Sequence, residues 1–324
     1  MTLYGWGNPR YFPRLPAPTR RLFDVAPATR VAADCHWQER PWTRTTLLAL
    51  HGLNGSSDAH YMRGLASKAF EHGFNVVRLN QRNCGATEHL AAGLFHSGLT
   101  TDAARLIEEL TSVDGLDSIV VAGYSLGGNL ALKLAGEYGA NPPASLRGVA
   151  AVSPIIEIEE CTRALERPEN FLYEWNFVRD LKRRMRVKGR LQPGTFDLSK
   201  LDAIRTVRGF DEVVTAPHFG FRNASDYYYR ASAMRVIDRV GVPALIITSE
   251  DDPFVPVHPF RDSRVRGNPN IDLRISAHGG HCGFVGDRVG DDDGYWAENQ
   301  IVEFVANQVQ QRQAIANCKS QIAN

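Results

Sequence analysis

The sequence has no excess of either charge. Its 324 residues include 37 lysines and arginines against 36 aspartates and glutamates, which leaves a formal net charge of +1 at pH 7. Such a balance gives no overall attraction to nucleic acid or to an anionic membrane surface. We therefore expect no nucleic-acid partner, and only a local basic patch could bring the chain to a membrane.

Cysteine is also scarce, and long apolar runs are missing. The five cysteines are scattered without a C-x-x-C spacing, which gives little support to a zinc site or a thioredoxin-like site, and a reducing compartment fits best. No apolar run approaches the length of a membrane span, and residues 1–10 contain no apolar signal-peptide core. We expect a cytoplasmic protein that has no transmembrane segment and needs no metal or cofactor.

Apolar residues make up 43% of the chain, which is enough for a large core. Strand-like runs occur at 45–50, 74–79, 118–122, 147–152, 243–248 and 271–275, with two weaker ones at 22–25 and 31–37. Helical spacing of apolar residues occurs at 99–111, 126–138 and 295–311. Strands separated by helices predict an α/β fold with a mostly parallel central sheet.

The segment 155–230 breaks this alternation. It has few strand signals, many charges and several aromatic residues, and we interpret it as a mainly helical cap insertion over a core formed by 1–154 and 231–324. Its basic run, 179–190, could contact an anionic substrate or phospholipid head groups, or it could be a solvated helix face. The aromatic residues just before this run could line a substrate pocket or form the small core of the cap: Tyr173, Trp175 and Phe177.

The sequence GYSLG at 123–127 matches the pattern G-x-S-x-G. A strand-like run ends at Ala122 and a helical run begins at Leu126, so the context is a strand, a tight turn and a helix. Such a turn is strained and lifts the serine hydroxyl clear of the sheet, and the flanking glycines avoid clashes with neighbouring elements. Ser125 is therefore our candidate nucleophile. The alternative is a glycine-rich turn with an incidental serine.

Two backbone N–H groups are candidates for binding an oxyanion. Ser125 would lie at a helix N-terminus, where unpaired N–H groups favour negative charge, and the N–H of Leu126 can face that charge. The second candidate is the N–H of Leu53, in the sequence HGLNG at 51–55 that follows the 45–50 strand. The alternative for this loop is an ordinary Gly/Asn turn with a buried structural histidine.

A serine becomes a strong nucleophile when a base accepts its proton, and imidazole has a suitable pKa near neutrality. The sequence AHGGHCGF at 277–284 follows the 271–275 strand and contains two histidines. We choose His281 as the base, because the glycines around it leave the ring free to reach into a cleft. We interpret His278 as a loop histidine that packs or caps.

An acidic sequence, EDD at 250–252, follows the 243–248 strand. Carboxylates at the carboxyl end of a core strand lie at the active-site edge of a parallel sheet. Asp252 is our candidate for the acid that orients the histidine, with Asp251 as the runner-up. The order nucleophile, acid, base along the chain is the one expected with a G-x-S-x-G serine. The alternative is a cluster of helix-capping residues.

Together these motifs resemble the YheT-like α/β-hydrolases, bacterial relatives of the EMB8 proteins and of some eukaryotic α/β-hydrolase-domain lipases. The matching stretches are HGLNG at 51–55, NVVRLNQRNCG at 75–85, FHSGLTTD at 95–102, GYSLGGNL at 123–130, YYRASA at 228–233, DDPFVP at 251–256 and GGHCGF at 279–284. The resemblance implies an α/β-hydrolase fold with a cap, and it assigns Ser125, Asp252 and His281 to a catalytic triad. One departure is Asn83, where the family usually has glycine.

The resemblance also implies hydrolysis of carboxylic esters, often with medium-chain acyl groups. We therefore expect a serine carboxylic ester hydrolase that acts through an acyl-enzyme on a small-molecule or lipid ester with a short to medium acyl chain, with transient membrane contact through the basic run as a further possibility. One alternative is an acyltransferase to an alcohol on the same triad, and another is a non-catalytic binding protein on the same fold. A dehalogenase is disfavoured, because such enzymes need a carboxylate where this chain has serine.

Overall fold

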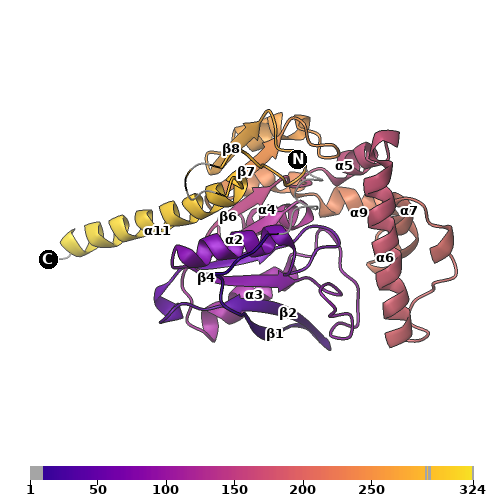
Figure 1. Cartoon of the computed structure of the whole chain (residues 1–324), viewed down its shortest axis with the longest axis horizontal. Coiled ribbons are helices and arrows are strands. Elements are labelled where there is room, and N and C mark those ends of the chain that lie inside the picture. Colours follow the sequence, from indigo (N-terminus) through magenta and orange to yellow (C-terminus); the bar gives the residue numbers. More distant parts are fainter. Residues whose placement is uncertain (1–9, 289, 291–292, 323–324) are drawn as a thin grey trace.

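The described residues, 10–288, 290 and 293–322 of a computed structural model, form an eight-stranded sheet with helices on both faces (Figure 1). The strands are β1 (Thr19–Ala26), β2 (Thr29–His36), β3 (Thr46–Leu50), β4 (Asn75–Asn80), β5 (Ile119–Tyr124), β6 (Leu146–Val152), β7 (Ala244–Ser249) and β8 (Ile271–Ser276). Their order is β1-β2-β4-β3-β5-β6-β7-β8. β2 pairs antiparallel with β1 and β4, and the other neighbours are parallel. The predicted mostly parallel sheet is confirmed.

The central strands are buried on both faces, which explains their continuous apolar sequences. The α-helices of the core are α2 (His60–Glu71), α3 (Thr101–Ser112), α4 (Leu126–Tyr138), α10 (Ser263–Arg266) and α11 (Trp296–Ile322). In β3, Leu47 packs in a cluster with residues of α2 and α11. Leu48 packs in a second cluster with residues of α3 and α4. Successive side chains of one strand thus enter two cores, one on each face of the sheet.

The six stronger predicted strands agree with the observed ones to within two residues at each end, and the predicted helix 126–138 coincides with α4. Helix α2 was not predicted, and α11 continues past the predicted end at 311. Within the described part of the chain, no helix combines the length and the apolar character needed to cross a membrane. The expectation of no signal peptide concerns residues 1–10, of which 1–9 lie outside the described residues.

The segment between β6 and β7 is helical. It contains α5 (Ile158–Leu165), α6 (Phe171–Leu191), α7 (Val207–Phe210), a π-helical turn (Asp211–Thr215), α8 (Ala216–His218) and α9 (Ala224–Ala231). Figure 1 shows α6 standing at one end of the sheet, on the opposite side of the molecule from the C-terminal end of α11. This is the mainly helical cap that the fold class predicts, and we keep the name cap for residues 155–230.

Two cations of the basic run attach α6 to the core. Lys188 is only 1% exposed, and its Nζ donates to the carbonyl oxygens of Glu88 and Ala91, in the loop after β4. Arg184 donates to the carbonyl oxygen of Asn54 at 2.8 Å, in the loop after β3. The solvated-face interpretation therefore fails for these two residues. It fits Arg183 and Arg186, whose side chains are 71% and 52% exposed.

Candidate active site

Ser125 occupies a strained turn between β5 and α4. Its φ is 53° and its ψ is −115°, a conformation that residues with a Cβ rarely adopt. A Cβ added at Gly123 would lie 2.1 Å from the carbonyl oxygen of Gly127, and one added at Gly127 would lie 2.3 Å from that of Leu50. Both glycines are therefore needed for α4 to begin this close to the carboxyl ends of β5 and β3, which holds Ser125 at that edge.

The N–H groups of Leu126 and Leu53 lie beside this turn. Leu126 is the first residue of α4, and Leu53 lies in the loop after β3. Both residues line a cavity that Ser125 also lines. Among the described residues, neither N–H has a hydrogen-bond acceptor. Two backbone donors are thus left beside the serine.

His51, which precedes this loop, has a structural place. Its ring is fully buried, with Nδ1 2.8 Å from the carbonyl oxygen of Gly52, and its Nε2 accepts from the N–H of Gln81 at 3.2 Å. Burial lowers the pKa of His51 to about 4. His51 is therefore a neutral, buried structural histidine, which agrees with the alternative given above for the loop 51–55. Its hydrogen bonds support the backbone next to Leu53.

His281 and Asp252 are in direct contact. Nδ1 of His281 lies 2.9 Å from Oδ2 of Asp252, whose side chain is completely buried. The other carboxylate oxygen of Asp252 accepts from the N–H groups of Phe254 and Val255 at 3.1 and 2.9 Å. These two bonds fix the carboxylate, and the carboxylate in turn fixes the orientation of the imidazole.

Asp251 has different partners. Its Oδ1 accepts from the N–H groups of Gly279 and Gly280 at 2.8 and 2.7 Å. The side chain of His278 is 79% exposed, with Nδ1 3.5 Å from Oδ2 of Asp251. The two neighbouring acids thus have different contacts. Asp251 binds the backbone of the glycine-rich loop, and Asp252 contacts the ring of His281 in that loop.

The surroundings of His281 change the pKa of its imidazole. Burial disfavours the imidazolium, but the neighbouring Cys282 sulfur and the Asp252 carboxylate favour it more and raise the pKa of His281 above its ordinary value. The ring packs against Phe254, with 4.2 Å between centroids. His281 and Ser125 line the same cavity. Within the described residues, no group of three or more His, Cys, Asp and Glu side chains could hold a metal ion.

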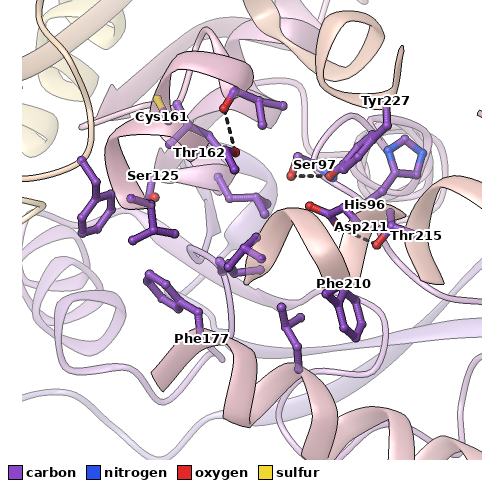
Figure 2. A pocket seen from close by; sticks show the side chains of 18 of the residues that line it. His96, Ser97, Ser125, Cys161, Thr162, Phe177, Phe210, Asp211, Thr215 and Tyr227 are labelled. Carbon is purple, nitrogen blue, oxygen red and sulfur yellow. Dashed lines mark hydrogen bonds between the residues drawn. The ribbon is translucent and has the colours of Figure 1, made fainter. Parts of the chain in front are cut away.

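Two cavities meet at Ser125. The first, the cap cavity, has a volume of about 110 Å³ and lies between the cap and the serine (Figure 2). The second, the loop cavity, has a volume of about 220 Å³ and contains His281 and residues 52–55 in its lining. Leu53 and Phe177 line both cavities. Phe177 of α6 therefore lines cavities beside Ser125, which agrees with the interpretation that it lines a pocket.

The loop that contains Asn83 keeps a conformation suited to glycine. Asn83 has a φ of 63°, in the left-handed region that glycine favours and asparagine tolerates. Its side-chain amide donates to the carbonyl oxygen of Gly93 at 3.1 Å. The departure from the family's glycine is thus accommodated by the backbone and gains a hydrogen bond.

The family follows from a comparison of the whole sequence. A family model described as "alpha/beta hydrolase fold" matches residues 45–287. The chain belongs to the alpha/beta hydrolase fold family. The match runs from the start of β3 to beyond β8, and it includes Ser125, Asp252 and His281. The predicted α/β-hydrolase fold is confirmed.

Among alpha/beta hydrolases, the YheT-like resemblance is confirmed as well. The chain is 30% identical over 300 residues to "Putative esterase YheT" of Escherichia coli (strain K12), covering 91% of this chain and 84% of that protein. It is 30% identical to "Phospholipase ABHD3" of Mus musculus, covering 75% of this chain and 59% of that protein. It is 29% identical to "Medium-chain fatty acid ethyl ester synthase/esterase 2" of Saccharomyces cerevisiae, covering 86% and 66%.

Solved structures of other alpha/beta hydrolases share the fold. The esterase Pf2001 of Pyrococcus furiosus matches with a TM-score of 0.60 at 15% identity, covering 90% of this chain and 92% of that one. Est1E from Butyrivibrio proteoclasticus matches with a TM-score of 0.57 at 17% identity, covering 90% and 99%. At these identities the likeness establishes the architecture alone.

Proposed function

We propose that the protein is a serine carboxylic ester hydrolase that acts through an acyl-enzyme. The observation that carries the proposal is the contact between His281 and buried Asp252, with His281 lining the same cavity as Ser125. In this assignment Ser125 is the nucleophile, His281 the general base and acid, and Asp252 the residue that orients the imidazole.

The proposed reaction begins when Ser125 Oγ attacks the ester carbonyl carbon while His281 Nε2 takes the hydroxyl proton. The carbonyl oxygen becomes an oxyanion, which accepts from the N–H groups of Leu53 and Leu126. Collapse of this intermediate breaks the ester C–O bond, and His281 returns the proton to the leaving alcohol. Water then repeats the sequence on the acyl-enzyme, which releases the acid and restores Ser125.

The relatives support ester chemistry. Their names include an esterase, a phospholipase and a medium-chain fatty acid ethyl ester synthase/esterase. The cap cavity supports a short to medium acyl group, because it is small and mostly apolar next to Ser125. We propose that residues 155–230 act as the cap that sets this acyl specificity, with residues 1–154 and 231–324 as the catalytic core.

A labelling experiment tests the nucleophile. A fluorophosphonate probe forms a covalent bond with an activated serine, so the wild-type protein should be labelled at Ser125 and Ser125→Ala should not. Ser112→Ala is the matched control, because Ser112 is an exposed serine of α3 whose hydroxyl donates to Glu108 of its own helix. Absence of label on the wild type would instead support a non-catalytic binding protein.

A second experiment separates the two neighbouring acids. Asp252→Asn should lower kcat on p-nitrophenyl butyrate by about 10⁴-fold, as the same change of the orienting carboxylate does in serine hydrolases. Asp251→Asn should lower kcat far less, because Asp251 accepts from the N–H groups of Gly279 and Gly280 and does not contact the imidazole of His281. Equal losses in both variants would contradict the assignment of Asp252.

Acyl transfer to an alcohol is the second candidate function. The loop cavity beside Ser125 and His281 has room for an alcohol in place of water, and the yeast relative's name includes ester synthesis. Both functions share the acyl-enzyme, so labelling does not separate them. Product analysis with ethanol and a longer alcohol does, because a transferase forms the new ester in preference to the free acid.

A further inference from the structure

The cap cavity has a polar end far from the proposed nucleophile. Figure 2 shows Ser125 on one side of the cavity and a cluster of polar side chains on the opposite side. This cluster, the distal polar group, consists of His96, Ser97, Asp211, Thr215 and Tyr227. The rest of the lining is mostly apolar and includes Leu165 and Val207. A plain hydrocarbon pocket does not need five polar side chains at its far end.

Asp211 is the charged member of the distal polar group. It begins the π-helical turn, a conformation that is rare and often found at functional sites. Its Oδ1 accepts from the Thr215 hydroxyl at 2.7 Å and its Oδ2 from the Tyr228 hydroxyl at 2.8 Å. Burial raises the pKa of Asp211 to about 6, against the effect of these two bonds. Each carboxylate oxygen keeps a second lone pair, so Asp211 can accept from a further donor.

His96 supplies a donor to the same end of the cavity. Its Nδ1 accepts from the N–H of Gly98 at 3.1 Å, which places the proton of the neutral ring on Nε2. Burial lowers the pKa of His96 to about 3, so the ring stays neutral. Within the described part of the chain, no group accepts from this Nε2–H. The rings of Phe219 and Tyr227 pack edge-on against the imidazole and hold it in place.

We propose that the cap cavity selects acyl groups that carry a hydroxyl at the end remote from the ester. A hydroxyl both donates and accepts, so it can donate to Asp211 and accept from His96 at once. A terminal methyl would give neither the spare lone pairs of Asp211 nor the Nε2–H of His96 a hydrogen bond, and the lost bonds cost affinity. A terminal carboxylate would meet the negative charge of Asp211 in a desolvated site. This inference rests on the proposed function, because it concerns the acyl part of its substrate.

The size of the cavity limits the acyl chain. An engineered cavity of roughly 150 Å³ holds a benzene molecule, and the cap cavity has about 110 Å³. The cap cavity is the smaller of the two, so it limits the acyl group to a short chain of about six carbons at most, with the carbonyl outside it at the Leu53 and Leu126 N–H groups. The natural substrate class is thus a short ω-hydroxyacyl ester.

Three ethyl esters of equal chain length test the proposal on the full-length protein. They are ethyl hexanoate, ethyl 6-hydroxyhexanoate and monoethyl adipate, which differ only in a terminal methyl, hydroxyl or carboxylate. Acid release in a pH-stat gives kcat/KM for each. We expect the hydroxy ester to be preferred about tenfold over ethyl hexanoate, and monoethyl adipate to be the poorest. Equal values for the methyl and hydroxyl esters would overturn the proposal.

Variants at Asp211 test where the preference arises. Asp211→Leu should reverse the preference between ethyl hexanoate and ethyl 6-hydroxyhexanoate. Asp211→Asn keeps the shape of the side chain without the charge, so it should improve monoethyl adipate relative to the wild type, and it decides the matter if the leucine variant does not fold. Leu165→Met is the matched control, because Leu165 also lies in the cavity lining but offers a substrate hydroxyl no hydrogen bond. It should keep the preference for the hydroxy ester.

The failure of this inference is distinguishable from failure of the proposed function. If no ester is cleaved and the fluorophosphonate probe leaves Ser125 unlabelled, the hydrolase assignment fails. If esters are cleaved through Ser125 with no preference for the hydroxyl, or if Asp211→Leu keeps the wild-type preference, only the role of the distal polar group fails.

Discussion

Arg184 of the cap helix α6 donates a hydrogen bond to the carbonyl oxygen of Asn54 at 2.8 Å. The same guanidinium lies 2.6 Å from the sulfur of Cys84, and the side chain of Asn54 donates to the carbonyl oxygen of Phe177 at 3.0 Å. Asn54 is the next residue after Leu53 and has a φ of 59°. The cap therefore holds the backbone that presents one of the two proposed oxyanion donors.

Replacement of Arg184 should weaken catalysis more than binding. Arg184→Leu removes a charge-assisted hydrogen bond to the loop, so Leu53 would be held less firmly, and we expect kcat to fall about tenfold with little change in KM. Arg186→Leu is the matched control, because Arg186 pairs with exposed Asp202 on the other side of the helix. Steady-state kinetics on p-nitrophenyl butyrate measure both, and an unchanged kcat in Arg184→Leu would contradict a role for the cap in placing this loop.

Relief of the strain at Ser125 should stabilise the protein. Glycine adopts a φ of 53° without penalty, so it relieves a strain of about 1–3 kcal/mol. This gain exceeds the free-energy cost of about 0.5–1 kcal/mol that comes from the extra conformational entropy of glycine in the unfolded chain. Ser125→Gly should therefore unfold about 2 °C above Ser125→Ala, which keeps the strain. Calorimetry of the two inactive variants makes the comparison, and equal melting temperatures would show that the turn is not strained.

Activity should rise with pH. His281 accepts a proton only when its ring is neutral, and its raised pKa moves the rising limb of the kcat/KM profile towards alkaline pH. Burial opposes this shift, and the Cys282 sulfur and the Asp252 carboxylate cause it. Cys282→Ala removes one of the two causes, so its limb should lie at lower pH than that of the wild type. Cys35→Ala is the control, because it changes a buried thiol of β2, and it should leave the pH profile unchanged. If the rising limb of Cys282→Ala lies at the same pH as that of the wild type, Cys282 does not raise the pKa of His281.

A methyl group at Gly127 should prevent the close approach of α4 to β3. The added Cβ would overlap the carbonyl oxygen of Leu50 at 2.3 Å, and overpacking of this kind costs about 1–3 kcal/mol. Gly127→Ala should therefore show a much lower free energy of unfolding in urea. Gly93→Ala is the control, because the nearest atom to its Cβ would be 3.5 Å away, and similar losses in both variants would argue against tight packing at the turn.

The sheet could be predicted because the apolar pattern within each central strand is enough to identify it. A run such as 118–122 is continuously β-branched or apolar, and only a strand buried on both faces needs that pattern. Helix α2 lacked a comparable signal. Its buried face includes Gly64 and Ala66, and its N-cap is Ala59, which has no side-chain hydrogen bond to offer the first turn. Small residues bury little apolar area, so the helical spacing was weak.

The residues of the candidate site could be predicted where a short sequence motif contains them. The turn predicts Ser125, and the pattern D-x-x-V-P at 252–256 together with the family resemblance favours Asp252 over its neighbour Asp251. Arg184 was missed because the basic run covers several faces of α6. Its spacing from Phe177 and Lys188 puts all three on one face, which is the signal that would have found it. Within the distal polar group, His96 and Ser97 belong to the quoted stretch 95–102, whereas Asp211, Thr215 and Tyr227 belong to none of the quoted motifs, and only packing brings the two sets together.

The meeting of the two cavities at Ser125 has a kinetic consequence. We infer that an acyl group held under the cap leaves the loop cavity vacant as soon as the alcohol departs, so the second substrate enters the space that the first product has left. Turnover would then be ping-pong, and the product alcohol would compete with water for the same intermediate. The partition between free acid and new ester is therefore set in the loop cavity, whereas the identity of the acid is set in the cap cavity.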